Sequence, residues 1–248
     1  MINLNLSQNQ YSDFVNLTNN VFLPLKHFVN KKEFELIVNK SRYKNKFFPF
    51  PIFFGVDEKT FKNVIYSKKL NLLYKKKPVA QICNISFFKI DKKKFGKKIY
   101  GRKFLKHPFY KKFDKENYIF MNFRISKMYS LRISNKKFIS PRAVLKLIDQ
   151  YKFKIISSFH TRNVPHQAHQ WIHKFLLNQS DMLIIQPLIG QYKTGEYKDS
   201  IIIKSNKVVS KTYKKKVLVI PFFSYPRYGG PREAALHALV RKNYGCSL

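Results

Sequence analysis

The chain has 248 residues, enough for one large domain or two smaller ones, and its 44% hydrophobic content excludes a disordered chain. Lysine and arginine number 49 against 13 aspartate and glutamate, a formal net charge of +36. Such a charge is typical of proteins that bind nucleic acid. The excess is spread over the whole chain together with many Asn, Ile, Phe and Tyr, all residues with AT-rich codons. We therefore attribute it to base composition rather than to a polyanion partner.

The cysteines and the N-terminus bear on the compartment. Cys83 and Cys246 are far apart and form neither a disulfide framework nor a CxxC metal pair. The sequence MINLNLSQNQYSDF lacks the basic and apolar regions of a signal peptide. No uncharged apolar run approaches the roughly 20 residues of a membrane span. We expect a cytoplasmic protein without a membrane partner.

Short strands are predicted to dominate the first half of the chain. Residues 11–40 read as short helices, since KKEFELIV has its apolar residues on one helical face. From residue 47 to about 135, apolar bursts of strand length alternate with polar turns. The lysines at 75–77 indicate a turn between two strands, and Pro49 and Pro51 indicate an edge strand or the entry into a sheet.

Strands and helices alternate in the second half, which is typical of βαβ units with a parallel sheet. A helix is predicted for PRAVLKLIDQY, with Pro141 at its start. The following elements are a strand (153–159), a helix (165–178), a strand (182–188), a loop (189–199), a lysine-rich stretch, a strand (217–223) and a helix from Pro231.

The segment FHTRNVPHQAH joins the first of these strands to its helix. Ligands of open parallel sheets bind beyond the carboxyl ends of strands, and a helix N-terminus suits a phosphate or sulfate. Asn163 could cap this helix, Pro165 fits its first turn, and Arg162 adds a planar fork of donors. His166 and His169 are three residues apart, so they share a helical face, where they could stabilise charge on phosphate oxygens.

Two other interpretations of these histidines remain open. His166, His169 and His173 share a helical face and could be zinc ligands, although no carboxylate or cysteine stands beside them and Arg162 would repel a cation. They could also be surface residues of an ordinary loop between a strand and a helix.

A second polar cluster lies in FFSYPRYGGPREAALHALVRKNYGC, residues 222–246. Gly229 and Gly230 allow close backbone approach, Pro231 starts the helix and Gly245 ends it. Its basic residues would surround an anion site: Arg227, Arg232, His237, Arg241 and Lys242.

Together these segments resemble the ATP sulfurylases (sulfate adenylyltransferases). HTRNVPHQAH, residues 160–169, is similar to the family's Q-T-R-N-P-x-H-x-x-H motif. QPLIGQYKTGE, residues 186–196, is similar to H-P-L-x-G-x-x-K-x-G-D, and residues 225–246 to M-R-Y-A-G-P-R-E-A-x-x-H-A-x-x-R-K-N-Y-G-C. FPFPIFFGVD and HPFY match more loosely in the first half, so the resemblance covers essentially the whole chain.

The resemblance implies a fold of class α/β plus β. A PUA-like β-rich N-terminal domain, residues 1–150, would precede part of a Rossmann-like nucleotidyltransferase domain with a parallel sheet, residues 151–248. The implied reaction, in sulfate assimilation, converts ATP and sulfate to adenylyl sulfate and pyrophosphate, with Mg²⁺ on the triphosphate. The implied partners are ATP and sulfate, and either further copies of the chain or a separately encoded C-terminal piece.

The site residues are carried over from the same motifs. The implied catalytic residues are Thr161, Arg162, Asn163, His166 and His169. His160 and Arg162 would bind sulfate, and residues 160–163 would bind ATP, with no resident metal ion. The implied rim residues are Gln191, Lys193 and Arg227.

Several positions depart from the family pattern. His160 stands where the family usually has Gln, and Gln186 and Glu196 replace the usual His and Asp. The family block F-I-V-G-R-D-H-A-G, which supplies further ATP and sulfate contacts, does not follow Cys246, so we expect a truncated or split enzyme whose activity alone is open. The alternatives are a basic RNA-binding PUA-like protein without enzyme activity, and a nucleotidyltransferase with another acceptor.

Overall fold

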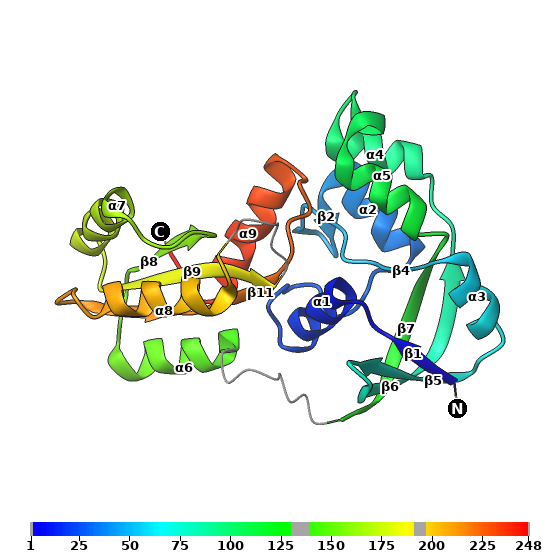
Figure 1. Ribbon diagram of the computed structural model, residues 1–248, viewed down its shortest axis with the longest axis horizontal. Helices are drawn as coiled ribbons and strands as arrows, with labels where there is room; N and C mark the ends of the chain where they lie inside the picture. The colour runs from blue at the N-terminus through cyan, green and yellow to red at the C-terminus, as the bar shows by residue number, and fades with distance from the viewer. Residues whose placement is uncertain (1, 130–138, 191–196, 248) are drawn as a thin grey trace. The chain divides into compact units, whose positions relative to one another are not determined.

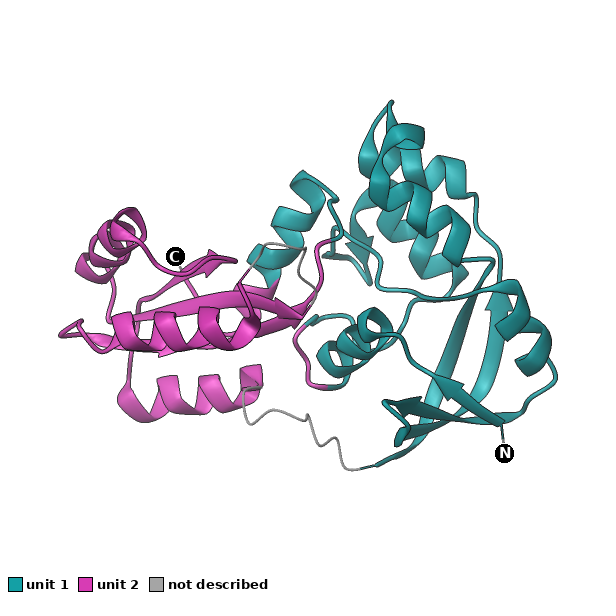
Figure 2. Cartoon of the chain, in the orientation of Figure 1, with its two compact units in different colours: residues 1–18, 22–131, 227–239 teal, residues 19–21, 132–226, 240–248 magenta. Residues whose placement is uncertain are grey.

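The computed structural model describes residues 2–129, 139–190 and 197–247 (Figure 1). Its contacts divide the chain into two compact units, shown in Figure 2. Unit 1 comprises residues 1–18, 22–131 and 227–239, and unit 2 comprises residues 19–21, 132–226 and 240–248. Each unit therefore draws on separate segments of the chain. A single domain boundary near residue 150 stays a prediction.

Unit 1 is built on a five-stranded sheet with the order β1-β5-β6-β7-β4. The strands are β1 (Ile2–Asn5), β4 (Phe54–Val56), β5 (Lys69–Tyr74), β6 (Lys77–Phe88) and β7 (Ile119–Met128). Among the strands that the structure describes in this sheet, only β1 and β5 pair in parallel. A two-residue turn joins β5 to β6, and its Lys75 and Lys76 have φ of 49° and 63°, so the predicted turn is confirmed. The strand after Pro49 and Pro51 lies at a sheet edge, as predicted.

Unit 1 also contains several helices. They are α1 (Gln8–Thr18), α2 (Lys31–Lys40), α3 (Glu58–Val64), α4 (Lys92–Tyr100) and α5 (Pro108–Glu116), with a short 3-10 turn (Phe104–Lys106) and a small ribbon of β2 (Arg42–Tyr43) and β3 (Lys46–Phe47). The helix predicted for KKEFELIV is confirmed, and Asn30 and Glu33 form a capping box at its start. The sequence did not predict α3, α4 and α5. Helices α3 and α4 begin at local caps, where Asp57 accepts from the N–H of Thr60 (2.7 Å) and Asp91 from that of Lys94 (2.9 Å), and α5 begins at Pro108 without a side-chain cap.

Unit 2 holds a parallel sheet centred on β9 (Met182–Gly190). On one side β9 pairs with β8 (Ile156–Thr161), and on the other with β10 (Lys216–Val219) and then β11 (Phe222–Ser224). The helices are α6 (Pro141–Tyr151), α7 (Gln167–Asn178) and α8 (Asp199–Ser210). Leu177, Leu183, Ile185 and Val219 form a hydrophobic cluster on one face of the sheet. The predicted parallel βαβ architecture is confirmed.

Three predicted elements of unit 2 need correction. The predicted strand 217–223 is two strands, because Pro221 has no N–H to donate and interrupts the ladder between β10 and β11. The helix predicted from Pro165 begins at Gln167, since His166 is still extended, with φ of −129° and ψ of 178°. The lysine-rich stretch contains α8, which buries Ile202, Ile203 and Asn206 along one side.

The last helix, α9 (Pro231–Asn243), begins in unit 1 and ends in unit 2. Gly245 follows it with φ of +90°, which confirms the predicted glycine stop. Within the described ranges, no helix combines the length and the apolar character needed to cross a membrane.

Candidate functional site

The candidate site of unit 2 lies at the carboxyl end of β8, where the chain turns into α7. Thr161 closes β8 and is buried, and its Oγ1 accepts a hydrogen bond from the N–H of Asn163 at 3.0 Å. Asn206 of α8 donates from Nδ2 to the carbonyl of Asn163 at 3.4 Å. Side chains from a strand and from a second helix therefore hold this loop, so Arg162 is presented from a fixed backbone.

His166 and His169 lie together at the start of α7, as their spacing predicted. Their rings stack with centroids 3.8 Å apart, and the ring of Phe159 meets His169 edge-on at 5.1 Å. Burial and the neighbouring His166 lower the pKa of His169, against a hydrogen bond to the Val164 backbone that raises it. The side chain of His166 does not cap α7.

His173, the third histidine of α7, is a core residue. It is fully buried, its Nδ1 lies 2.9 Å from the hydroxyl of Tyr213, and its ring packs edge-on against Phe159. Burial, followed by His169, lowers its pKa to about 4. Among the residues that the structure describes, no group of three His, Cys, Asp or Glu side chains is placed to hold a metal ion.

His160 and Gln186 occupy register-matched positions on β8 and β9. The Nδ1 of His160 lies 3.1 Å from the Gln186 carbonyl, and because a carbonyl only accepts, Nδ1 carries the proton. Burial, Arg241 and Arg162 lower the pKa of His160 to about 4, against the hydrogen bond to Gln186, which raises it. His160 is therefore a neutral imidazole near pH 7. Sequence reasoning did not select Gln186, although a lone polar residue in the apolar run MLIIQPLI was a usable signal.

Gly190 fixes the backbone at the carboxyl end of β9. Its φ is +130°, and a Cβ at this position would lie 2.6 Å from the carbonyl oxygen of Ser224 in β11. Only glycine fits there. The next residues include the predicted rim positions Gln191 and Lys193, which lie outside the described residues, so their roles stay predictions.

Two arginines of the second polar cluster make their polar contacts within unit 1. Arg227 is 1% exposed, and its guanidinium pairs with the buried carboxylate of Asp13 between the rings of Phe22 and Phe50, each 5.8 Å away. Arg232 donates to three backbone carbonyls, those of Ile37 (3.2 Å), Val38 (3.0 Å) and Pro49 (3.3 Å). Arg227 thus makes its charged contact within unit 1, and its predicted place at the site rim stays a prediction.

The predicted anion position at the start of α9 is filled by a carboxylate of the chain itself. Glu233 accepts from the N–H of Arg227 at 2.6 Å and from that of Gly229 at 3.0 Å. These donors, which could have cradled a phosphate, are therefore satisfied within unit 1.

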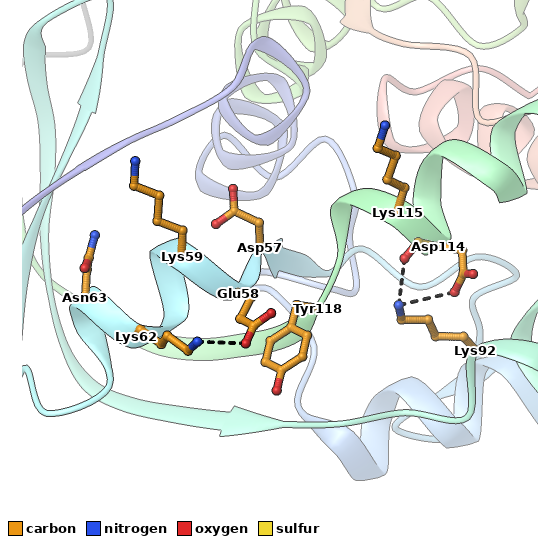
Figure 3. Close-up of a pocket in the computed structure, with 9 residues that line it drawn as sticks. All are labelled: Asp57, Glu58, Lys59, Lys62, Asn63, Lys92, Asp114, Lys115 and Tyr118. Atoms are coloured by element: carbon orange, nitrogen blue, oxygen red, sulfur yellow. Dashed lines mark hydrogen bonds and ion pairs between the residues drawn. The ribbon is translucent and has the colours of Figure 1, made fainter.

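A hollow of about 680 Å³ lies on unit 1 beside α3 and α5 (Figure 3). Lysine and acidic side chains line it in nearly matched pairs: Lys62 contacts Glu58 at 2.9 Å, and Lys92 contacts Asp114 at 3.2 Å. Because these charges largely neutralise one another, the hollow offers little net positive charge to an anion.

Comparison with known proteins identifies both parts of the chain. Residues 1–122 match the family model of the PUA-like domain, and residues 135–248 match that of ATP-sulfurylase. The second half of the chain is therefore similar to the ATP-sulfurylase family. The sulfate adenylyltransferase of Ignicoccus hospitalis is 30% identical over 100% of this chain and 66% of its own length, and that of Pyrococcus abyssi is 30% identical over 95% and 62%. The chain thus spans just under two thirds of these relatives.

A solved structure shares the fold. The hexameric APS kinase from Thiobacillus denitrificans superposes with a TM-score of 0.73 at 15% identity, over 100% of this chain and 46% of that one. The family resemblance drawn from the motifs is confirmed. So is the predicted succession of a PUA-like N-terminal domain and an α/β domain with a parallel sheet.

Proposed function

We propose that this chain is an ATP-sulfurylase and acts in sulfate activation, as a nucleotidyltransferase that converts ATP and sulfate to adenylyl sulfate and pyrophosphate. The observation that carries the proposal is the loop after β8, in which Thr161, Asn163 and Asn206 hold the backbone on both sides of Arg162. We take unit 2 as the Rossmann-like part of the catalytic domain. The reaction would take place in the cytoplasm.

In this proposal a sulfate oxygen attacks the α-phosphorus of ATP in line. The new bond joins sulfur-bound oxygen to phosphorus, the bond to the β-phosphate oxygen breaks, and pyrophosphate leaves. Arg162 holds sulfate, Thr161 and Asn163 contact the phosphates, and the stacked His166 and His169 stabilise charge in the transition state. His160 is neutral and its only N–H donates to the Gln186 carbonyl, so we do not assign it the predicted sulfate contact. Mg²⁺ enters as part of the substrate MgATP and not as an ion held by the protein.

The proposal is tested by sulfate-dependent release of pyrophosphate from MgATP by the purified chain. Replacement of Arg162 by alanine should lower kcat/KM at least ~100-fold, because a charge-assisted contact to the reacting anion is lost. Arg142→Ala, at an exposed position of α6, is the matched control and should leave the rate unchanged. No sulfate-dependent release by the wild-type chain, or equal rates for both variants, would contradict the proposal.

We also propose that the chain assembles with copies of itself, since its structural neighbour is described as hexameric. Light scattering coupled to size-exclusion chromatography measures this directly, and a monomer at micromolar concentration would contradict it.

RNA binding is the second candidate function, favoured by the net charge of +36. It predicts RNA affinity with sequence or structure preference that persists at physiological salt. Binding that is indifferent to sequence and lost near that salt concentration would reflect bulk charge alone.

A further inference from the structure

A largely buried polar cluster of unit 2 lies on the strands that lead into the loop carrying Arg162. Side chains alternate between the faces of a strand, and register partners on parallel strands point to the same face. Phe159 and Ile185 belong to the face with the hydrophobic cluster. His160 and Gln186 therefore lie on the opposite face, at the carboxyl end of the sheet and two residues before Arg162.

Gln186 has an unsatisfied amide. Its exposure is 0%, and neither Nε2 nor Oε1 has a hydrogen-bond partner among the described residues. A buried polar atom left without a partner destabilises the fold, and a native protein retains one where a water or a ligand completes it. An apolar residue would suit this strand interior better, since five of the neighbouring β9 residues are buried and apolar: Met182, Leu183, Ile184, Ile185 and Leu188.

Arg241 adds a partly buried positive charge near His160. Its Nη1 is buried without a partner, and no carboxylate in the described part of the chain pairs with it. Its charge is one of the causes that lower the pKa of His160, which places the two groups within electrostatic reach. Burial raises the pKa of the neighbouring Cys246 thiol to about 11, so this thiol stays neutral and supplies no counter-charge. A partly buried guanidinium with a buried, unpartnered Nη1 is stabilised when an anion enters.

We propose that Gln186 and Arg241, beside the neutral His160, bind the oxyanion that attacks the nucleotide. This inference rests on the proposed function and adds two substrate-binding residues to it. Arg241 supplies guanidinium donors and Gln186 an amide NH₂, and both suit a fully deprotonated tetrahedral dianion such as sulfate or selenate. The remaining amide oxygen of Gln186 accepts from a water that enters with the anion.

The experiment titrates the full chain with sodium sulfate by calorimetry at constant ionic strength, with and without a non-hydrolysable ATP analogue. Gln186→Leu and Arg241→Met should each bind sulfate about tenfold to 100-fold more weakly, the range for a lost hydrogen bond to a charged group. Their affinity for the nucleotide analogue should stay within about twofold of wild type. Gln150→Leu and Arg142→Met, the same changes at exposed positions of α6, are the matched controls.

The thermal midpoint separates binding from folding. Gln186→Leu removes two unsatisfied polar atoms at nearly constant volume, so its midpoint should equal or exceed that of wild type although sulfate binding is lost. If Arg241→Met does not fold, Arg241→Lys keeps the charge and should bind sulfate with intermediate affinity. Wild-type sulfate affinity in Gln186→Leu and in the folded variant at position 241 would overturn the inference and leave the proposed function standing. Absence of both sulfate and nucleotide binding in the wild-type chain would overturn both.

Discussion

Replacing Arg227 by methionine leaves the carboxylate of Asp13 buried in unit 1 without its guanidinium. Arg227 is 1% exposed and Asp13 3%, so water does not reach either group to take over the lost interaction. Methionine has a comparable length and can still pack between Phe22 and Phe50, which flank the guanidinium at 5.8 Å. The substitution therefore removes the charge and its hydrogen bonds while it retains most of the packing.

Removal of one partner from a buried ion pair costs about 3–5 kcal/mol. For a chain of this size, about 2–4 °C per kcal/mol converts this loss to a midpoint roughly 6–20 °C lower. The double variant Asp13→Leu with Arg227→Met should recover part of the loss, because an apolar pair of similar volume replaces a buried ion pair with little change. The coupling between the two sites then shows that the charge, and not the shape, is responsible.

Urea unfolding followed by two probes measures the effect. The chain has one tryptophan, Trp171 in α7 of unit 2, so its fluorescence reports that unit, while far-UV circular dichroism reports both. We expect the dichroism transition of Arg227→Met to move to lower urea than the fluorescence transition. Arg102→Met, at an exposed position of unit 1, is the matched control. A loss below about 1 kcal/mol, equal to that of the control, would refute the reasoning.

Three further predictions concern single positions. Gly190→Ala should lower the free energy of unfolding by about 2 kcal/mol or more, and by more than Gly101→Ala, since both have positive φ but only the Cβ at 190 meets a backbone oxygen. Changing Lys75-Lys76 to Asn-Gly should raise the free energy of unfolding by about 1 kcal/mol, because Asn-Gly favours the positive φ angles of this turn. An unchanged urea midpoint would contradict this prediction. The pKa of His160 is lowered from 6.5 to about 4, so the unfolded chain binds more protons in this window. The free energy of unfolding of the wild type should therefore fall as the pH drops from 6.5 to 4, by roughly 3 kcal/mol more than that of His160→Gln. Parallel pH profiles of the free energy of unfolding for the two proteins would contradict this prediction.

The parts of the fold that follow local rules could be predicted from the sequence. The turn at Lys75 and Lys76 and the start of α6 at Pro141 depend on a few neighbouring residues, and both are confirmed. Helix α4 (KKKFGKKIY) escaped prediction because only two of its apolar side chains, Phe95 and Ile99, form its buried stripe. In α8 the isoleucines and valines favour a strand by propensity, and packing of Ile202 and Ile203 on the sheet overrides this preference.

The roles of basic residues depend on partners that sequence spacing does not reveal. Arg227 stands beside a glycine-rich turn and a helix start, which is the pattern of an anion site. Its actual partner, Asp13, lies 214 positions earlier in the chain. Such pairings arise from tertiary packing, so the sequence indicated that the segment was basic and could not say which of its arginines were already neutralised.

Two departures from the family pattern also depend on tertiary packing that sequence spacing does not reveal. His160 stands where the family usually has Gln, and Gln186, 26 positions later, stands where it usually has His. The register of β8 and β9 makes them partners on one face of the sheet. One imidazole and one amide are therefore retained at this pair of positions, with their order reversed. Both groups offer hydrogen-bond donors and acceptors of similar reach, so the reversal keeps the same polar groups near Arg162. The effect of each substitution therefore depends on the presence of the other.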